Sequence, residues 1–354
     1  MKKHNFYAGP AILPAPVLKE AAEAVNSFAD MGLSILEISH RSKQFTAVLE
    51  EAEALTRELL NVSDDYDVLF LTGGASSQFY MTAMNILNVG ETAGYVDTGA
   101  WSTKAIKEAK LFGNIEVLAS SKDKNYAYLP KGYAIPANLR YLHLTSNNTI
   151  YGTQYQTFPE TDVPFVCDMS SDIFSRPLDV NKFDVIYAGA QKNLGPAGTT
   201  LVIVKKDILG KVEREIPTML DYQTHIKKGS AFNTPPAYPI YVCMLTMRWL
   251  KANGGVAAMQ AKNEAKAQLL YDAIDASPVF VGPAAKEDRS RMNVNFVFNE
   301  GYEHLEEQFL AAATEANCVG VKGHRSVGGF RASIYNAMDI SSVEVLTNVI
   351  RNFG

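Results

Sequence analysis

Hydrophobic residues follow two different spacings between Tyr66 and Lys205. Short runs rich in β-branched and aromatic residues, such as Tyr66–Leu71 and Val185–Ala190, are typical of buried strands. Several of these runs lead into stretches with helical character, for example Gln78–Leu87 and Trp101–Phe112. This alternation predicts an α/β fold, with a mostly parallel sheet of about seven strands and helices on both faces. The five further predicted strands are Thr92–Val96, Ile115–Ala119, Arg140–Thr145, Phe165–Met169 and Thr200–Val204.

The two ends of the chain predict additional helices and a second, smaller unit. One helix is expected from about Pro16 to Phe28, and Ser42 is placed to cap another helix that carries the apolar stripe Phe45–Leu59. Beyond Lys205 we expect helices over 239–251 and 256–276, a strand–helix–strand pattern over 292–299, 303–316 and 331–335, and a closing helix from about 341. We therefore expect a large domain over residues 15–255 and a small α+β domain over residues 256–354, which the N-terminal segment 1–14 joins.

The composition is that of an ordinary soluble globular protein, with 354 residues of which 47% are hydrophobic and 20% charged. The net charge of −5 predicts no nucleic-acid partner, and no apolar run approaches the length needed to span a membrane. Early prolines interrupt any signal-peptide core. The three cysteines have no metal-site spacing, so we expect no metal, no disulfide framework and a cytoplasmic location.

One lysine stands out because of where the strand pattern places it. Lys192 follows the predicted strand Val185–Ala190 and is surrounded by small residues, at the edge where open α/β sheets hold their ligands. A lone lysine in a loop is usually only a solvated charge. However, Asp168 lies at the end of the neighbouring run Phe165–Met169. A lysine for a Schiff base and an aspartate for a pyridinium nitrogen are the two groups that a pyridoxal phosphate site needs.

Two further features are compatible with such a site. The turn Gly73–Ser76 lies between a predicted strand and a predicted helix, so its backbone N–H groups can hold a phosphate. Most Gly-Gly turns are only turns, and this alternative stays open. Trp101 lies at another strand-to-helix junction, where its ring can stack on a cofactor, although a core tryptophan would fit the same pattern.

The order and spacing of these residues resemble the class V, fold-type I pyridoxal-phosphate-dependent aminotransferases. The resemblance covers nearly the whole chain, in the segments NFYAGPAILP, EISHRS, LTGGASSQF, SNNTIYGT, CDMSSD, YAGAQKNLGPAG, FNTPP and GHRSVGGFRASIYNA. It implies that Lys192 forms the Schiff base with pyridoxal 5′-phosphate and that Asp168 pairs with the ring nitrogen. It also implies that Trp101 stacks on the ring and that Thr149 lies near it.

The same resemblance assigns the cofactor phosphate to two parts of the chain. Ala75, Ser76 and Gln191 would approach it from one subunit, whereas Asn233 and Thr234 would reach it from a second subunit. Nothing in the strand–helix pattern brings this second segment back to the glycine turn of its own chain. The resemblance instead implies a homodimer in which the two subunits share their active sites. Some relatives have an arginine at the position of Ser76, so this chain has one cation fewer near the phosphate.

Within this family, the chain is similar to the branch that forms phosphoserine. That similarity implies transamination of 3-phosphohydroxypyruvate with L-glutamate to O-phospho-L-serine and 2-oxoglutarate in serine biosynthesis, with pyridoxine biosynthesis as a second pathway that some relatives serve. Arg331 would bind the α-carboxylate. The phosphate or the glutamate γ-carboxylate would be surrounded by His40, Arg41, His324 and Arg325. Arginine suits both anions because its planar fork binds them bidentately, although each His-Arg pair alone would be an ordinary solvated loop charge.

Three alternatives stay open on the sequence alone. Another class V enzyme, such as an alanine–glyoxylate aminotransferase, would share the same cofactor site. A cysteine desulfurase would need a mobile nucleophilic cysteine, whereas Cys318 is expected to be buried. A non-catalytic binding protein with this fold is the third, and the presence of both Lys192 and Asp168 argues against it.

Overall fold

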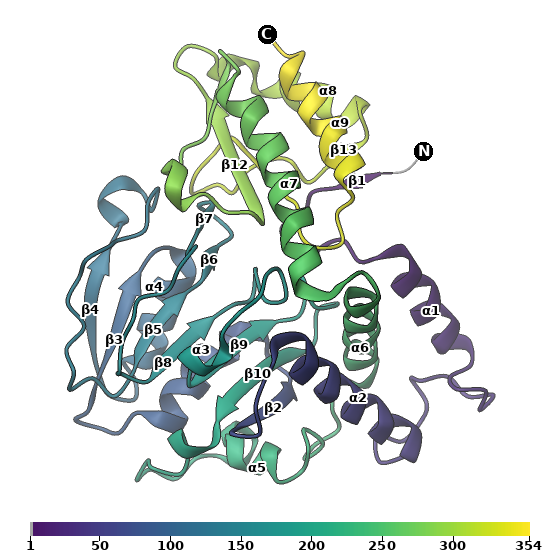
Figure 1. The fold of residues 1–354 in the computed structure, drawn as a ribbon, viewed down its shortest axis with the longest axis vertical. Helices are drawn as coiled ribbons and strands as arrows, with labels where there is room; N and C mark the ends of the chain where they lie inside the picture. Colours follow the sequence, from purple (N-terminus) through teal and green to yellow (C-terminus); the bar gives the residue numbers. More distant parts are fainter. Residues whose placement is uncertain (1–2) are drawn as a thin grey trace.

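The computed structural model describes residues 3–354, and a seven-stranded sheet lies at its centre (Figure 1). The strand order is β2–β10–β9–β8–β5–β3–β4, and only β10 runs antiparallel to its neighbours. The mostly parallel α/β sheet of seven strands is therefore confirmed. The strands are β2 (Tyr66–Leu71), β3 (Thr92–Asp97), β4 (Asn114–Ser120), β5 (Leu142–Thr145), β8 (Phe165–Asp168), β9 (Val185–Gly189) and β10 (Thr200–Lys205).

Helices cover both faces of this sheet because successive strand residues point to opposite sides. Val68 and Phe70 of β2 belong to a core cluster with α1 (Ala15–Asn26), α2 (Lys43–Leu60) and α6 (Ala237–Ala252). The intervening Leu69 and Leu71 belong to a different cluster, on the other face. The helices of that second cluster are α3 (Gly74–Ile86), α4 (Ala100–Ala109) and α5 (Tyr222–Ile226).

A smaller α+β unit follows the sheet and lies above it in Figure 1. Its antiparallel sheet has the order β11–β12–β14. The elements are β11 (Phe280–Val281), β12 (Asn293–Phe298), β13 (Cys318–Val319), β14 (Phe330–Ser333), α7 (Gly255–Asp275), α8 (Glu306–Glu315) and α9 (Ile340–Arg351). Helix α7 runs from this unit down toward α6, as Figure 1 shows.

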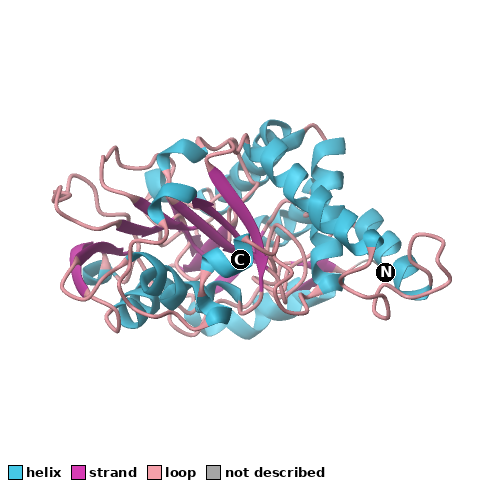
Figure 2. Cartoon of the chain, turned by 90° about the horizontal axis from the view of Figure 1, so that it is seen from below, coloured by secondary structure: helices cyan, strands magenta, loops and turns pink. Residues whose placement is uncertain are grey.

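The N-terminal segment lies with the smaller unit. Strand β1 (His4–Asn5) pairs in parallel with β13, and Phe6 is fully buried in the cluster formed by α7, α8 and α9. This contact supports the grouping of segment 1–14 with residues 256–354, and the boundary at residue 255 stays our proposal. The view in Figure 2 shows the chain from below. No helix within residues 3–354 has the length and apolar character needed to cross a membrane.

Most of the expected helices and strands form within a few residues of their predicted ends, with one informative exception. Helix α3 begins at Gly74 rather than at Gln78. Gly73 caps it with a φ of 94°, a left-handed conformation that glycine adopts without strain. The residues predicted as a turn therefore form the first turn of a helix. The short elements α5, β1, β11, β13, β6 (Asn147–Asn148) and β7 (Thr153–Gln154) were not predicted.

Candidate active site

Asp168 and Lys192 lie at the same edge of the sheet because β8 and β9 are parallel neighbours. Asp168 is the last residue of β8, and Lys192 follows the end of β9. The chain turns tightly after β9, where the N–H groups of Lys192 and Gly195 both donate to the carbonyl of Ala190, at 2.7 and 2.8 Å. This turn places the lysine at the carboxyl ends of the strands, where ligands bind in such sheets.

The Lys192 side chain is partly buried, and its Nζ donates a hydrogen bond of 2.7 Å to Thr149 Oγ1. Burial lowers the pKa of Lys192 from 10.5 to about 8, and the charge of Arg331 acts in the same direction. The carboxylate of Asp168 opposes this shift. The amine is thus neutral in a substantial fraction of molecules near pH 8, which a nucleophile requires.

Asp168 is buried, with 5% of its surface exposed. Its Oδ1 accepts hydrogen bonds from the N–H of Ser170 at 2.9 Å and from the Ser170 hydroxyl at 2.7 Å. Burial raises the pKa of Asp168, and the Ser170 hydrogen bonds and the Lys192 charge oppose that change. Ser170 stands two residues after Asp168 in the run CDMSSD, and it was not among the predicted site residues.

The N-terminus of α3 faces the same site without a side-chain cap. Its first helical bond runs from the N–H of Ser77 to the carbonyl of Gly73 at 3.4 Å, so the earlier N–H groups have no partner within the helix. A Cβ added to Gly74 would meet no atom within 4 Å, so this end of the helix is open. Free N–H groups at a helix N-terminus are suited to bind a phosphate.

One cavity connects these groups. It is lined by Gly74, Ala75, Ser76, Phe79, Trp101, Thr145, Asn147, Asp168, Ser170, Ser171, Gln191 and Lys192. Lys192 Nζ lies 6.0 Å from the centroid of the Trp101 ring. The Trp101 Nε1 is buried and has no hydrogen-bond partner within the described chain. The structure therefore brings Ala75, Ser76 and Gln191 together with the lysine and the aspartate.

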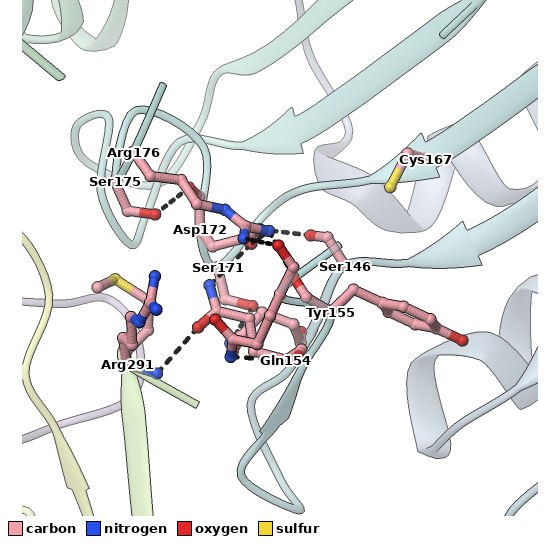
Figure 3. A network of polar contacts seen from close by, with 12 residues as sticks. Ser146, Gln154, Tyr155, Cys167, Ser171, Asp172, Ser175, Arg176 and Arg291 are labelled. Atoms are coloured by element: carbon pink, nitrogen blue, oxygen red, sulfur yellow. Dashed lines mark hydrogen bonds and ion pairs between the residues drawn. The ribbon is translucent and has the colours of Figure 1, made fainter. Parts of the chain in front are cut away.

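A buried ionic network lies beside this cavity (Figure 3). Asp172 accepts hydrogen bonds from Ser146 Oγ and, at 3.1 Å, from Gln154 Nε2, and it lies 3.7 Å from Arg176 Nη2. The backbone N–H of Ser146 donates in turn to the carbonyl of Asp168 at 2.9 Å. No local signal in the sequence predicted this network, because its members come from separate parts of the chain.

Arg331 reaches the site from β14 of the smaller unit. Its Nη1 donates to the backbone carbonyl of Thr149 at 3.3 Å, and its buried Nε has no partner among residues 3–354. Burial lowers its pKa. The turn after β13 carries a partly buried His324 and an exposed Arg325. Burial lowers the pKa of His324, and the positive charges of Arg331, Arg325 and Lys104 act in the same direction.

His40 and Arg41 are not brought to this cavity within one chain. They lie in the connection between α1 and α2, where Arg41 is exposed. Within residues 3–354, no hydrogen bond or ion pair joins either side chain to Lys192 or Arg331. The His40 Nε2 is buried without a hydrogen-bond partner in that part of the chain.

Asn233 and Thr234 lie between α5 and α6, in a segment that comes near the start of α3 in the same chain. Asn233 lines a second cavity together with Gly73 and Ser77 of its own chain. The segment returns to this point because Ser230 Oγ accepts a hydrogen bond of 3.0 Å from the N–H of Phe70 in β2. The strand–helix pattern gave no sign of this approach, which depends on a tertiary contact, so the segment lies nearer its own glycine turn than that pattern indicated. Thr234 is exposed.

Comparisons with known proteins agree with this architecture. A family model for class-V aminotransferases matches residues 3–346. A phosphoserine aminotransferase from Parabacteroides distasonis is 60% identical over 353 residues, which cover 100% of this chain and 99% of that protein. A solved phosphoserine aminotransferase structure, described in terms of radiation damage of its Schiff base, is 51% identical with a TM-score of 0.95, covering 99% of this chain and 98% of that one.

A second solved structure, at lower sequence identity, also matches nearly the whole chain. The phosphoserine aminotransferase of Trichomonas vaginalis with bound pyridoxal phosphate is 36% identical to this chain, with a TM-score of 0.94, and the match covers 99% of this chain and 100% of that one. With the family model spanning nearly all residues and a relative at 60% identity, the chain belongs to the class-V aminotransferase family and, within it, to the phosphoserine aminotransferases.

Proposed function

We propose that this chain transfers an amino group from L-glutamate to 3-phosphohydroxypyruvate, giving 2-oxoglutarate and O-phospho-L-serine, with pyridoxal 5′-phosphate bound at Lys192. The observation that carries this proposal is the shared cavity of Lys192, Asp168 and the uncapped N-terminus of α3. An amine, a buried carboxylate and free helix N–H groups fit the aldehyde, the ring nitrogen and the phosphate of this cofactor. Serine biosynthesis is the pathway that this reaction would serve.

When bound, pyridoxal phosphate supplies an electron sink for the carbanion formed at the substrate Cα. Lys192 would hold the aldehyde carbon of the cofactor, and its Nζ is placed to take the substrate Cα proton as a general base and to return it as an acid. A pKa of about 8 suits this role because the amine can both accept and return a proton near neutral pH. Asp168 would keep a proton on the ring nitrogen of the bound cofactor, and the Ser170 hydrogen bonds hold the Asp168 carboxylate in place.

The cofactor phosphate is assigned to the first turn of α3. The N–H groups of Ala75 and Ser76 are available to it, and Gln191 lines the same cavity. Trp101 provides an aromatic face within that cavity. Ser76 contributes a hydroxyl rather than a positive charge, so the helix N-terminus carries more of the phosphate binding here than in relatives with arginine.

The substrate anions are assigned to the cations around the cavity. Arg331 binds the α-carboxylate, because it lies beside Thr149, the residue that contacts Lys192 Nζ. His324 and Arg325 bind the distal phosphate or γ-carboxylate from the adjacent turn. Two buried nitrogens without partners in the described chain, Arg331 Nε and His40 Nε2, are donors that such anions would satisfy.

We further propose a homodimer in which each subunit completes the other's site. Among the described residues that line the cavity, neither His40 nor Arg41 appears, and we assign both to the cavity of the partner on the family resemblance. The α1–α2 region that carries them also exposes large apolar side chains: Leu18, Leu33 and Leu36 are 52%, 47% and 62% exposed. Such side chains are often covered in an assembly. Asn233 and Thr234 are assigned to the partner's cofactor phosphate on the family resemblance. We propose a cytoplasmic location, which the three free, buried cysteines favour.

The competing desulfurase activity lacks its nucleophile. Cys167, Cys243 and Cys318 are all buried, and Cys318 lies in β13 with a pKa raised by burial to about 11. A thiol in that state is a poor nucleophile. The buried position expected for Cys318 is confirmed. An alanine–glyoxylate aminotransferase is the other rival, and substrate competition separates it from the proposed activity.

The purified enzyme with cofactor should form O-phosphoserine from glutamate and 3-phosphohydroxypyruvate, measured by chromatography. Alanine and glyoxylate, supplied together at the same concentrations, serve as the matched control. The proposal requires a much faster reaction with the first pair. A faster reaction with the second pair would replace it by the alanine–glyoxylate alternative.

A further inference from the structure

Three buried asparagines from distant parts of the chain meet directly behind the catalytic lysine. Asn193 follows Lys192, Asn263 lies in α7, and Asn336 follows β14. The backbone N–H of Asn336 donates to Asn193 Oδ1 at 3.0 Å, and Asn263 Nδ2 donates to Asn336 Oδ1 at 2.9 Å. We call Asn193, Asn263 and Asn336 the asparagine junction.

Each member of the asparagine junction also binds the loop 171–175, which follows Asp168 and β8. Their side-chain amides donate to backbone carbonyls of this loop. The acceptors are Ser171 for Asn193 at 3.1 Å, Phe174 for Asn336 at 3.0 Å and Ser175 for Asn263 at 3.1 Å. The junction therefore joins the smaller unit to the part of the sheet that carries Asp168 and Lys192.

The segment around Asn336 is held rigidly from α7. Lys266, which is only 2% exposed, donates from Nζ to the carbonyls of Ile334 and Tyr335 at 2.9 and 2.7 Å. Asn263 lies one helical turn earlier on the same face. Asn263 and Lys266 of α7 thus hold the three consecutive residues 334–336. These residues directly follow β14, the strand that carries Arg331.

Lys192 and Arg331 are connected through two routes. The first passes through Thr149, whose hydroxyl accepts from Lys192 Nζ and whose carbonyl accepts from Arg331 Nη1. It uses the same lysine and arginine atoms that must engage cofactor and substrate. The second passes from the backbone beside Lys192 through Asn193 and Asn336 to the strand of Arg331, and it leaves both functional side chains free.

We propose that Asn193 is a positioning residue, which through Asn336 sets the separation between Lys192 and Arg331 while ligands occupy the site. The inference rests on the proposed function, because it takes Arg331 to bind the α-carboxylate. A substrate held by this carboxylate presents its Cα to Lys192 Nζ only if the two residues keep their spacing. A displacement of about 1 Å in such a geometry can reduce the rate by about a hundredfold.

The test uses the holoenzyme and α-methylglutamate, which carries the α-carboxylate but has no Cα proton to lose. Its dissociation constant, followed through the visible cofactor band, reports substrate positioning without turnover. We expect Asn193→Ala to weaken binding of α-methylglutamate and to raise the glutamate KM by about tenfold, and to lower kcat/KM by up to about a hundredfold. Cofactor affinity, measured by equilibrium dialysis, should change by less than about twofold, because Asn193 does not line the cofactor cavity.

Asn85→Ala is the matched control. Asn85 is also a buried asparagine with three side-chain hydrogen bonds, to Met81, Leu220 and Tyr222, but it lies near the far end of α3. This variant should lower the melting temperature and leave the α-methylglutamate affinity unchanged. Asn263→Ala provides a second junction variant, with an expected loss of affinity in the same direction but smaller, because the bond between Asn193 and Asn336 remains.

Wild-type affinity for α-methylglutamate in a folded Asn193→Ala protein would overturn the inference while leaving the proposed function intact. An Asn85→Ala protein that loses as much affinity as Asn193→Ala would also overturn it, since the effect would then be one of general stability. If Asn193→Ala does not fold, an unchanged affinity for α-methylglutamate in Asn263→Ala would overturn the inference. Failure of the wild-type enzyme to bind α-methylglutamate would instead refute the proposed function, and the inference would fall with it.

Discussion

Lys192 donates its 2.7 Å hydrogen bond to the hydroxyl of Thr149, a residue from a different strand connection, within a site that also contains the Asp168 carboxylate. The lysine is therefore held in a fixed position before any ligand arrives. Burial weakens its hold on the proton, whereas the negative charge of Asp168 strengthens it. The balance of these two effects gives the first prediction.

In the cofactor-free protein, the reactivity of Lys192 toward an amine-specific reagent should rise with pH around a midpoint near 8. Its pKa is lowered to about 8, so the neutral amine becomes the major form above that pH rather than above 10.5. Removing the negative charge with Asp168→Asn should move the midpoint lower still, because this charge stabilises the protonated amine. Mass spectrometry of the labelled peptide measures both midpoints. A midpoint near 10.5 in the wild-type protein would contradict the assigned burial of the amine.

Asp168→Asn should reduce amino transfer by at least about a hundredfold while the cofactor remains bound, because the ring nitrogen loses the charge that keeps it protonated. Asp184→Asn is the control. Asp184 Oδ2 accepts from the N–H of Phe165 at 2.8 Å, at the opposite end of the same strand β8, so its loss removes a carboxylate without touching the site. The measurement is the steady-state rate of amino transfer for each variant, compared with that of the wild type. Equal rates for Asp168→Asn and wild type would require a different partner for the ring nitrogen.

The enzyme should prefer 3-phosphohydroxypyruvate over hydroxypyruvate by up to about 10⁴–10⁵-fold in kcat/KM, because a site built for an anion leaves its donors unpaired without one. Arg325→Gln should shrink this preference by acting on the phosphorylated substrate alone. Arg331→Gln should impair both substrates, since both carry an α-carboxylate. The measurement is the ratio of kcat/KM for 3-phosphohydroxypyruvate to kcat/KM for hydroxypyruvate, in each variant and in the wild type. Similar kcat/KM values for the two keto acids in the wild type would disprove the phosphate assignment.

Shared sites make a prediction about mixed dimers. One subunit would carry Lys192→Ala, and the other Asn233→Ala with Thr234→Ala. If the Asn233 segment acts on the partner's cofactor, both lesions fall on one site, and the mixed dimer should keep about half of the wild-type activity. If it acts on its own chain, near Gly73 and Ser77, both sites are damaged and the activity should match that of the parents. Activity of the purified mixed dimer distinguishes these outcomes, and a fully active monomer would rule out the shared site.

Much of the fold was predictable because the local signals agreed with the tertiary structure. Ser42 caps α2 by accepting from the N–H of Phe45, as its position before an apolar stripe indicated. Asp168 and Lys192 could be paired because each ends a buried strand, and consecutive parallel strands bring such ends together. The sequence could not show the start of α3, which depends on the left-handed conformation of Gly73.

The polar network behind the site was not predictable for a different reason. Asn193 and Asn336 are 143 residues apart, and the burial of each depends on hydrogen bonds that only the complete fold supplies. The same holds for Lys266, a lysine within a helical pattern whose burial no neighbour in the sequence indicates. Periodicity reports which face of an element is apolar, whereas a buried polar group is explained by its distant partners.

The most direct test of the account is the identity of the lysine that carries the cofactor. Treating the holoenzyme with sodium borohydride reduces an imine between lysine and pyridoxal phosphate to a stable bond, and peptide mass spectrometry then locates it. The account predicts one modified residue, Lys192, and no modified peptide in a Lys192→Ala protein treated in the same way. Modification at another lysine, such as the buried Lys266, or an unmodified Lys192 in active enzyme, would contradict it.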